Sequence, residues 1–115
     1  MPCRRGEVVL VLFPDSNLRT AKRRPALVVQ ADRLATGLSQ TIAAMVSSNV
    51  ARAGHPCRVL ASLATPEGKA SGLRTDPVTM TDNLATVFDG EIAGVIGEWT
   101  DMASVDRALR HTLGL

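Results

Sequence analysis

Short hydrophobic runs alternate with turn-forming residues along the whole chain. Several of these runs are rich in β-branched residues and are too short for helices, which favours β-strands. The expected strands cover residues 7–13, 26–29, 41–47, 57–61, 77–82 and 92–96. Because short strands at this spacing are typical of small barrels and rolled sheets, we predict a mainly β fold.

The end of the chain has the periodicity of a helix instead. From Met102 onwards, apolar residues recur at spacings of three and four, so one face of this segment is apolar. Thr100 or Asp101 can cap the start of the helix, and Gly114 can end it. Trp99 precedes the helix, and we expect it in the core. The predicted fold class is therefore β with α, a small barrel followed by one helix.

Local features are also expected between and on these elements. Residues 14–24 are predicted to form one long loop that ends where Pro25 opens the second strand. A helical turn is expected at 32–37, and residues 65–72 are expected to be a loop. Asp106 and Arg110 have the i,i+4 spacing of a surface ion pair on the helix.

Length and composition limit the class of protein. The chain has 115 residues, of which 45% are hydrophobic, so we expect a single domain covering residues 1–115. No apolar run reaches the roughly 18–20 residues that span a bilayer. The N-terminal segment also lacks the small-residue cleavage site of a secretory signal. We therefore expect a cytoplasmic protein with no membrane contact.

Cysteine and histidine are too few to suggest a disulfide framework or a metal site. Only Cys3 and Cys57 are present, and His55 and His111 are far apart in the sequence. The spacing of His55 and Cys57 allows a Cys/His nucleophile pair, although a turn histidine beside a strand cysteine is the favoured interpretation. No set of ligands has metal-site spacing, so we expect no metal and no cofactor.

The net charge of +2 hides an uneven distribution of basic residues. Six of the thirteen lysines and arginines lie in the first 24 positions, opposed there only by two acidic residues. The six are Arg4, Arg5, Arg19, Lys22, Arg23 and Arg24. Such asymmetry indicates a polyanionic partner at one face. Aromatic residues make up only 3% of the chain, which disfavours nucleic-acid binding by several stacked aromatic rings.

Polar residues at strand ends provide the candidate chemistry. Arg24 lies next to a predicted rigid strand, and its planar guanidinium can bind a phosphate through two hydrogen bonds. Lys22 and Arg23 are interpreted as general electrostatic attraction. Hydroxyl, amide and carboxylate groups follow the third and fifth strands at 47–49 and 82–83. RNA cleavage without a metal needs a base, an acid and cations for the charged phosphorane, which such residues can supply.

The order of these segments resembles the MazF/PemK family of toxins. The opening Arg5-Gly6-Glu7 strand is similar to the Arg-Gly-Asp/Glu start of that family, and Arg24-Pro25 with its hydrophobic run is similar to its Arg-Pro strand. Ser47-Ser48-Asn49 falls where the family commonly has Thr-Ser-Asn, and residues 78–86 resemble the strand that carries Asp-Gln. Residues 105–115 resemble the closing helix, so the resemblance covers nearly the whole chain.

This resemblance implies a small SH3-like β-barrel (CcdB/PemK-like) with a C-terminal helix, assembled as a homodimer. It also implies a sequence-specific endoribonuclease that needs no metal. Such enzymes cleave single-stranded RNA, often mRNA, and leave 2′,3′-cyclic phosphate and 5′-hydroxyl ends. An acidic, partly disordered antitoxin is expected to inhibit the toxin by covering the cationic surface around residues 19–24. Operator DNA is expected to be bound only by the toxin–antitoxin complex.

The family's functional residues can be carried over one at a time. The catalytic Arg corresponds to Arg24, the residue that steadies the transition state to Ser47, and the base-like Asp to Asp82. The expected RNA-binding residues are Arg19, Lys22, Arg23, Ser48, Asn49 and Asn83. The chain departs from the family at several positions. Ser47 replaces Thr, Asn83 replaces Gln, and Met80 and Ala85 stand where some members have Arg.

Two non-catalytic functions remain open from the sequence. The related CcdB toxins bind DNA gyrase through C-terminal residues, often Trp-Gly-Ile, and this chain ends in Leu113-Gly114-Leu115. A degenerate module that binds antitoxin and nucleic acid without turnover is the other alternative, suggested by Met80 and Ala85. The endoribonuclease is favoured over both alternatives.

Overall fold

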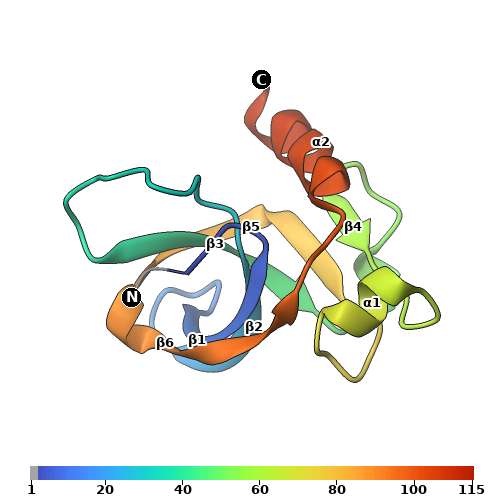
Figure 1. Ribbon diagram of the computed structural model, residues 1–115, viewed down its shortest axis with the longest axis horizontal. Coiled ribbons are helices and arrows are strands. Elements are labelled where there is room, and N and C mark those ends of the chain that lie inside the picture. The colour runs from blue at the N-terminus through green and yellow to red at the C-terminus, as the bar shows by residue number, and fades with distance from the viewer. Residues whose placement is uncertain (1–2) are drawn as a thin grey trace.

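The protein folds into one curled antiparallel sheet with a helix at the C-terminal end (Figure 1). The computed structural model describes residues 3–115. The strand order is β4-β5-β3-β2-β1-β6. The strands are β1 (Glu7–Pro14), β2 (Ala21–Val28), β3 (Gln40–Ser47), β4 (Arg58–Leu60), β5 (Val78–Phe88) and β6 (Ile92–Glu98). The helices are α1 (Pro66–Ala70) and α2 (Met102–Leu113), with 3-10 turns η1 (Val50–Arg52) and η2 (Asp89–Glu91). The predicted mainly β class with a C-terminal helix is confirmed.

Alternation along the strands gives the sheet two buried faces. Inside the curl, which we call the barrel face, a core cluster is built from β1, β2, β3 and β5 and includes Val11, Phe13 and Val87. On the opposite side, which we call the helix face, Leu27 packs in a second cluster with Trp99. Both faces of β1 and of the second half of β2 therefore carry apolar residues, which explains the continuous hydrophobic runs in these two segments.

Helix α2 covers the helix face and has both predicted ends. The Asp101 side chain caps its first turn, and Gly114 ends it in the left-handed conformation at φ 72°. Trp99 is 2% exposed, which confirms its place in the core. The predicted pair of Asp106 with Arg110 is wrong, because Asp106 instead accepts a hydrogen bond from Arg5 at 2.6 Å. Across residues 3–115, no helix combines the length and apolarity that crossing a membrane requires.

The basic triplet lies on a strand and not on a loop, contrary to the sequence prediction. β2 begins at Ala21, so Lys22, Arg23 and Arg24 pair with Phe13, Leu12 and Val11 of β1. The loop is accordingly shorter, and the strand is held by its ladder with β1 rather than by its own hydrophobicity. Pro25 lies within β2, one residue before pairing with β3 begins at Ala26, so its missing N–H interrupts no bond of that ladder.

Two other local predictions are also wrong. Residues 32–37 form no helix, since Arg33 and Ala35 have positive φ values of 58° and 55°, which a right-handed helix does not allow. Conversely, the loop expected at 65–72 contains α1. The Thr65 hydroxyl accepts a hydrogen bond from the Gly68 amide, and Pro66 occupies the first helical turn. A capping threonine followed by proline is a regular helix start. The proline and glycine in this segment had instead been interpreted as turn formers.

A bulge divides β5 into two parts. Met80 pairs with Met45 and Leu84 pairs with Ala44, so residues 81–83 have no partner on β3. The odd number of extra residues inverts the alternation of side chains. Val78 and Met80 share the barrel-face side before the bulge, whereas Ala85 and Val87 do so after it.

Candidate functional site

Arg24 lies at the edge of the barrel face, close to the point where β2 leaves β3. Its cross-strand partner Val11 belongs to the barrel-face core, so the Arg24 side chain starts on that face. The Arg24 Nη2 atom donates to Asp15 Oδ1 at 2.8 Å, and Asp15 also accepts from the Thr20 hydroxyl at 2.6 Å. These hydrogen bonds, that of Thr20 first and that of Arg24 second, lower the pKa of the Asp15 carboxyl. Asp15 therefore stays charged and fixes one end of the Arg24 guanidinium.

Ser47 ends β3 at the same level of the sheet. The β2–β3 ladder joins Val28 to Ala43 and Ala26 to Met45, and continuing that register by two residues brings Arg24 opposite Ser47. The ladder stops at Ala26, and a small pocket lined in part by Pro25 and Ser47 lies beyond it. The Ser47 hydroxyl oxygen accepts from the Asn49 backbone N–H at 3.1 Å. Ser47 is 7% exposed, and no hydrogen bond donated by its hydroxyl is found among residues 3–115, so this hydrogen is left for a ligand oxygen that enters the small pocket.

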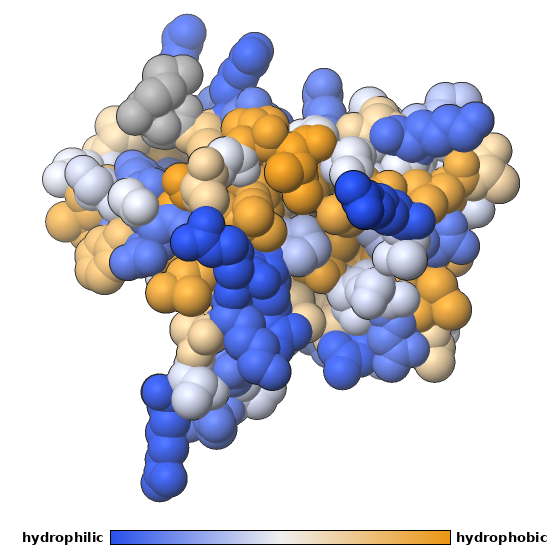
Figure 2. Space-filling model, turned by 90° about the horizontal axis from the view of Figure 1, so that it is seen from below, coloured by the Kyte–Doolittle hydropathy of each residue, from blue (hydrophilic) through white to orange (hydrophobic). Residues whose placement is uncertain are grey.

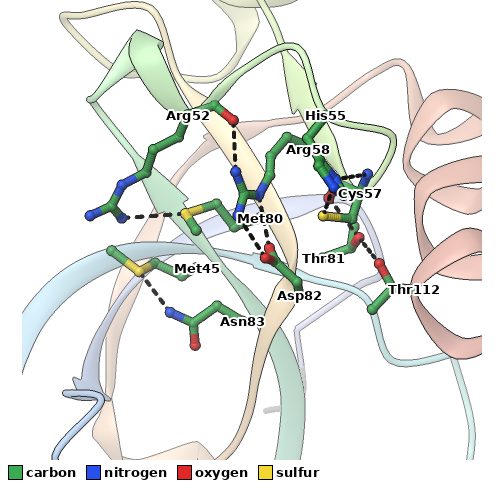
Figure 3. A network of polar contacts seen from close by, with 10 residues as sticks. All are labelled: Met45, Arg52, His55, Cys57, Arg58, Met80, Thr81, Asp82, Asn83 and Thr112. Carbon is green, nitrogen blue, oxygen red and sulfur yellow. Dashed lines mark hydrogen bonds and ion pairs between the residues drawn. The ribbon is translucent and has the colours of Figure 1, made fainter.

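Asp82 lies at the bulge of β5 and is engaged by a second arginine. Arg58 Nε donates to Asp82 Oδ1 at 3.1 Å, and Arg58 Nη2 donates to Asp82 Oδ2 at 2.7 Å (Figure 3). The Arg58 hydrogen bonds are the main cause that lowers the pKa of the Asp82 carboxyl. Ser47 pairs with Val78, four residues before Asp82, which at about 3.3 Å per residue is at most roughly 13 Å along β5. The register therefore brings Arg24 and Ser47 to one level, whereas Asp82 is hydrogen-bonded to Arg58, and no hydrogen bond among residues 3–115 joins its side chain to Arg24 or Ser47.

The barrel face between these groups is lined by two methionines and their polar neighbours. Asn83 Nδ2 lies 3.1 Å from Met45 Sδ, and Arg52 Nη1 lies 3.5 Å from Met80 Sδ (Figure 3). Within residues 3–115, Arg52 forms no salt bridge with a carboxylate. Its guanidinium can therefore contact an anion on this face.

Five of the six predicted RNA-binding residues fall into two groups, and the sixth, Asn83, lies in the bulge of β5 beside Met45. Arg19, Lys22 and Arg23 are exposed on the β1–β2 hairpin, while Ser48 and Asn49 are exposed just after β3. Figure 2 shows one face of the molecule, where strongly hydrophilic side chains form a band and project from it between exposed hydrophobic residues. The surface is thus mixed in character, and polar groups are available beside apolar ones.

Sequence reasoning missed Asp15, Arg52 and Arg58 as parts of this arrangement. Asp15 lies in a predicted turn. Arg52 and Arg58 lie outside the basic N-terminal segment that is predicted to bind a polyanion. Arg58 and Asp82 are 24 positions apart and meet only because β4 pairs with β5. Their opposite charges at the ends of neighbouring predicted strands were the one usable signal.

His55 and Cys57 are in contact, with Nδ1 and Sγ 2.8 Å apart. Cys57 is only 4% exposed and directly precedes β4, so its thiol is not open to a substrate. This arrangement supports the interpretation as a turn histidine and a structural cysteine. Among residues 3–115, no three His, Cys, Asp or Glu side chains are grouped so that they could hold a metal ion.

The comparison with known sequences points to one family. The profile of the PemK-like, MazF-like toxins of type II toxin–antitoxin systems matches residues 4–113. Endoribonuclease MazF2 of Mycobacterium bovis and endoribonuclease MazF6 of Mycobacterium tuberculosis are each 36% identical to this chain over 107 residues. Each match covers 90% of this chain and 90% of the relative.

Solved structures of similar proteins have the same fold. A mycobacterial endoribonuclease in complex with its cognate antitoxin superposes with a TM-score of 0.75 at 23% identity, over 99% of this chain and 97% of that one. MazF from Deinococcus radiodurans gives a TM-score of 0.72 at 23% identity, over 100% and 99% of the two chains. The family match and the curated relatives carry the assignment, and these structures confirm the fold. The chain therefore belongs to the PemK-like, MazF-like toxins of type II toxin–antitoxin systems, as a MazF-like endoribonuclease toxin.

Proposed function

We propose that this toxin cleaves single-stranded RNA, including mRNA, without a metal ion, and leaves 2′,3′-cyclic phosphate and 5′-hydroxyl ends. The observation that carries the proposal is the placement of Arg24 and Ser47 at one level of two diverging strands. Both side chains have hydrogen-bond donors left for a phosphate, since Asp15 and Asn49 occupy only part of their capacity.

The proposed reaction is an internal displacement at phosphorus. The ribose 2′-oxygen attacks the phosphate and forms the cyclic ester, the 2′-hydroxyl proton passes to a base, and the bond to the 5′-oxygen breaks as that oxygen gains a proton. Arg24 stabilises the extra negative charge of the phosphorane through its guanidinium. Ser47 donates its hydroxyl hydrogen to a phosphate oxygen.

The remaining predicted contacts orient the RNA around these two groups. Arg19, Lys22 and Arg23 attract the phosphate backbone from the hairpin. Ser48, Asn49 and Asn83 offer hydroxyl and amide groups that can hydrogen-bond phosphates or base edges.

Similar proteins have been solved with an antitoxin, including the mycobacterial endoribonuclease with its cognate antitoxin and MazE–MazF of Deinococcus radiodurans. We propose that this chain is a homodimer whose own antitoxin is acidic and covers the hairpin cations. Operator DNA is then bound only by the toxin–antitoxin complex. Antitoxin affinity should fall as salt rises from 50 to about 500 mM, because screening weakens exposed charge pairs. An affinity that does not depend on salt would show that the hairpin is not the main contact.

The cleavage proposal is tested with purified protein, a long single-stranded RNA and excess EDTA. We expect discrete fragments with cyclic phosphate ends from the natural chain and none from Arg24→Ala. Arg110→Ala, which removes an exposed arginine of α2, is the matched control and should cleave normally. Uncut RNA with the natural chain, or full activity of Arg24→Ala, would contradict the proposal. RNA binding without cleavage would instead favour the degenerate binding module.

A further inference from the structure

Arg58 joins the bulge of β5 to the turn that follows β3 (Figure 3). We propose that Arg58 and Asp82 form a clamp that positions Arg52 and the Ser47–Asn49 turn against RNA. In this role Asp82 is a positioning residue and not the base that the sequence resemblance implies. The inference rests on the proposed function, because RNA is the ligand toward which the clamp holds these groups.

The Arg58 guanidinium donates hydrogen bonds to two partners, the Asp82 carboxylate and the Arg52 backbone carbonyl. Its Nε and Nη2 atoms donate to the two oxygens of Asp82, at 3.1 and 2.7 Å. Its Nη1 atom donates to the Arg52 backbone carbonyl at 3.0 Å. The guanidinium is planar, and these three hydrogen bonds fix its orientation. The Arg52 carbonyl is therefore held at a fixed position relative to β5.

A continuous set of hydrogen bonds leads from that carbonyl to Ser47. Arg52 closes η1, whose first residue follows Asn49, and the Arg52 N–H donates to the Asn49 carbonyl at 3.0 Å. The Asn49 side chain accepts from the Ala51 N–H at 3.1 Å, which caps the turn. The Asn49 N–H in turn donates to the Ser47 hydroxyl oxygen at 3.1 Å. A change at Arg58 can therefore reach the Ser47 hydroxyl through the hydrogen bonds of the segment 47–52.

The Arg52 side chain is the group that the clamp presents to solvent. Its backbone carbonyl is fixed by Arg58, whereas its exposed guanidinium makes one hydrogen bond among residues 3–115, to Met80 Sδ at 3.5 Å. Thioether sulfur is a weak acceptor, so the guanidinium keeps its donors for a stronger one. An RNA phosphate crossing the barrel face provides such an acceptor.

The position of Asp82 is unsuitable for a base. Both oxygens already accept hydrogen bonds from Arg58, which favours the ionised form and lowers the pKa of the carboxyl. The bulge itself is anchored, because the Thr81 hydroxyl donates to the Cys57 carbonyl and lies 2.7 Å from the Thr112 hydroxyl of α2. Asp82 is thus a fixed, ionised partner for Arg58, with its carboxyl pKa lowered by the Arg58 hydrogen bonds.

The test separates binding from chemistry by combining two measurements. Affinity is measured for a single-stranded RNA in which every 2′-hydroxyl is methylated, so that it cannot be cleaved. The single-turnover rate is measured at saturating unmodified RNA. If the clamp holds, Asp82→Asn and Arg58→Gln each weaken affinity by a similar factor of about three to ten, and the double variant is no weaker than either. The saturating rate of Asp82→Asn stays within about tenfold of the natural chain, since no base is lost.

A base would give the opposite pattern. Asp82→Asn would then lower the saturating rate by roughly 10²–10⁴ and leave affinity unchanged, while Arg58→Gln would keep its rate. That result would overturn the clamp. It would also be overturned if Asp82→Asn still weakened RNA binding in an Arg52→Ala background, because the clamp acts through the segment that carries Arg52. Failure of the natural chain to cleave RNA would refute the proposed function. The affinity measurements with methylated RNA would still test the clamp.

A matched control excludes a general loss of structure. Asp106→Asn breaks another short ion pair, that of Arg5 with Asp106 at 2.6 Å, which joins α2 to the N-terminal segment. It should change neither the affinity nor the rate. Thermal unfolding of each variant is recorded alongside, and equal affinity losses in Asp106→Asn and Asp82→Asn would refute a specific role for the clamp.

Discussion

Replacing Gly97 with alanine should destabilise the fold, whereas the same change at Gly94 should not. Both glycines lie on β6, and neither has a positive φ, so backbone strain does not separate them. A Cβ at Gly97 would lie 2.1 Å from the Ser71 carbonyl oxygen and 2.6 Å from the Gly72 nitrogen. A Cβ at Gly94 would have no heavy atom within 4 Å. The two positions thus differ only in what surrounds them.

The size of the effect follows from these distances. Ser71 is fully buried, so the segment after α1 must move by about 1 Å to accept the methyl group at ordinary contact distance. Overpacking of this kind costs about 1–3 kcal/mol or somewhat more, and we expect about 3 kcal/mol here because backbone atoms must yield. For 115 residues, an unfolding entropy of about 2.1 cal/mol/K per residue converts this loss to a drop in Tm of about 12 °C. Gly94→Ala should lie within about 1 kcal/mol of the parent.

Urea unfolding monitored by Trp99 fluorescence measures the difference, in an Arg24→Ala background that avoids toxicity during expression. The slope with urea should stay the same, since both variants unfold to equivalent chains. Equal unfolding free energies for Gly97→Ala and Gly94→Ala would refute the reasoning. Such a result would mean that β6 and the segment after α1 are not in contact in solution.

Three further outcomes are expected. Arg24→Lys should lower the single-turnover cleavage rate at least tenfold, whereas Arg23→Lys should change it little, because only Arg24 is proposed to use a planar fork. Asp101→Ala should lower the unfolding free energy by about 1 kcal/mol in urea, since it removes the cap of α2. The pKa of Asp82 is lowered by its ion pair, so the stability from that pair is present above the unfolded pKa of about 3.9 and is lost as the pH falls through the folded value. The stability difference between the natural chain and Asp82→Asn should therefore shrink as the pH falls below about 4, measured by urea unfolding at each pH.

Elements with a clear period could be predicted from the sequence. The strand expected at 41–47 is found at Gln40–Ser47, and the C-terminal helix has the expected caps at both ends. In these segments local propensity and tertiary environment favour the same structure.

The prediction failed where a partner strand or a bulge overrides the local pattern. The charged start of β2 does not resemble a strand, and it becomes one because it continues the ladder with β1. The fifth strand was expected to end at Asp82, whereas β5 continues to Phe88. Since the bulge inverts its alternation, a period of two cannot be followed across it.

The candidate site was predictable one residue at a time but not as an arrangement. Arg24 and Ser47 were identified as residues at strand ends, yet their common level follows from the register of β2 with β3. The contact of Arg58 with Asp82 depends on the pairing of β4 with β5. Such contacts between distant positions are invisible to periodicity and spacing.

The unpaired residues 81–83 also determine where this chain can change in length. One residue gained or lost at 82–83 can be absorbed there, because the ladders on either side have independent registers, whereas Thr81 is fully buried and is hydrogen-bonded to Cys57 and Thr112. The same change within residues 84–88 would exchange Ala85 and Val87 for their neighbours on the buried face. Insertions and deletions at 82–83 would therefore displace Asp82 from Arg58 while Thr81 and the registers of both ladders stayed in place. Under the proposed clamp, a change of length in this segment would alter RNA recognition while the fold persists.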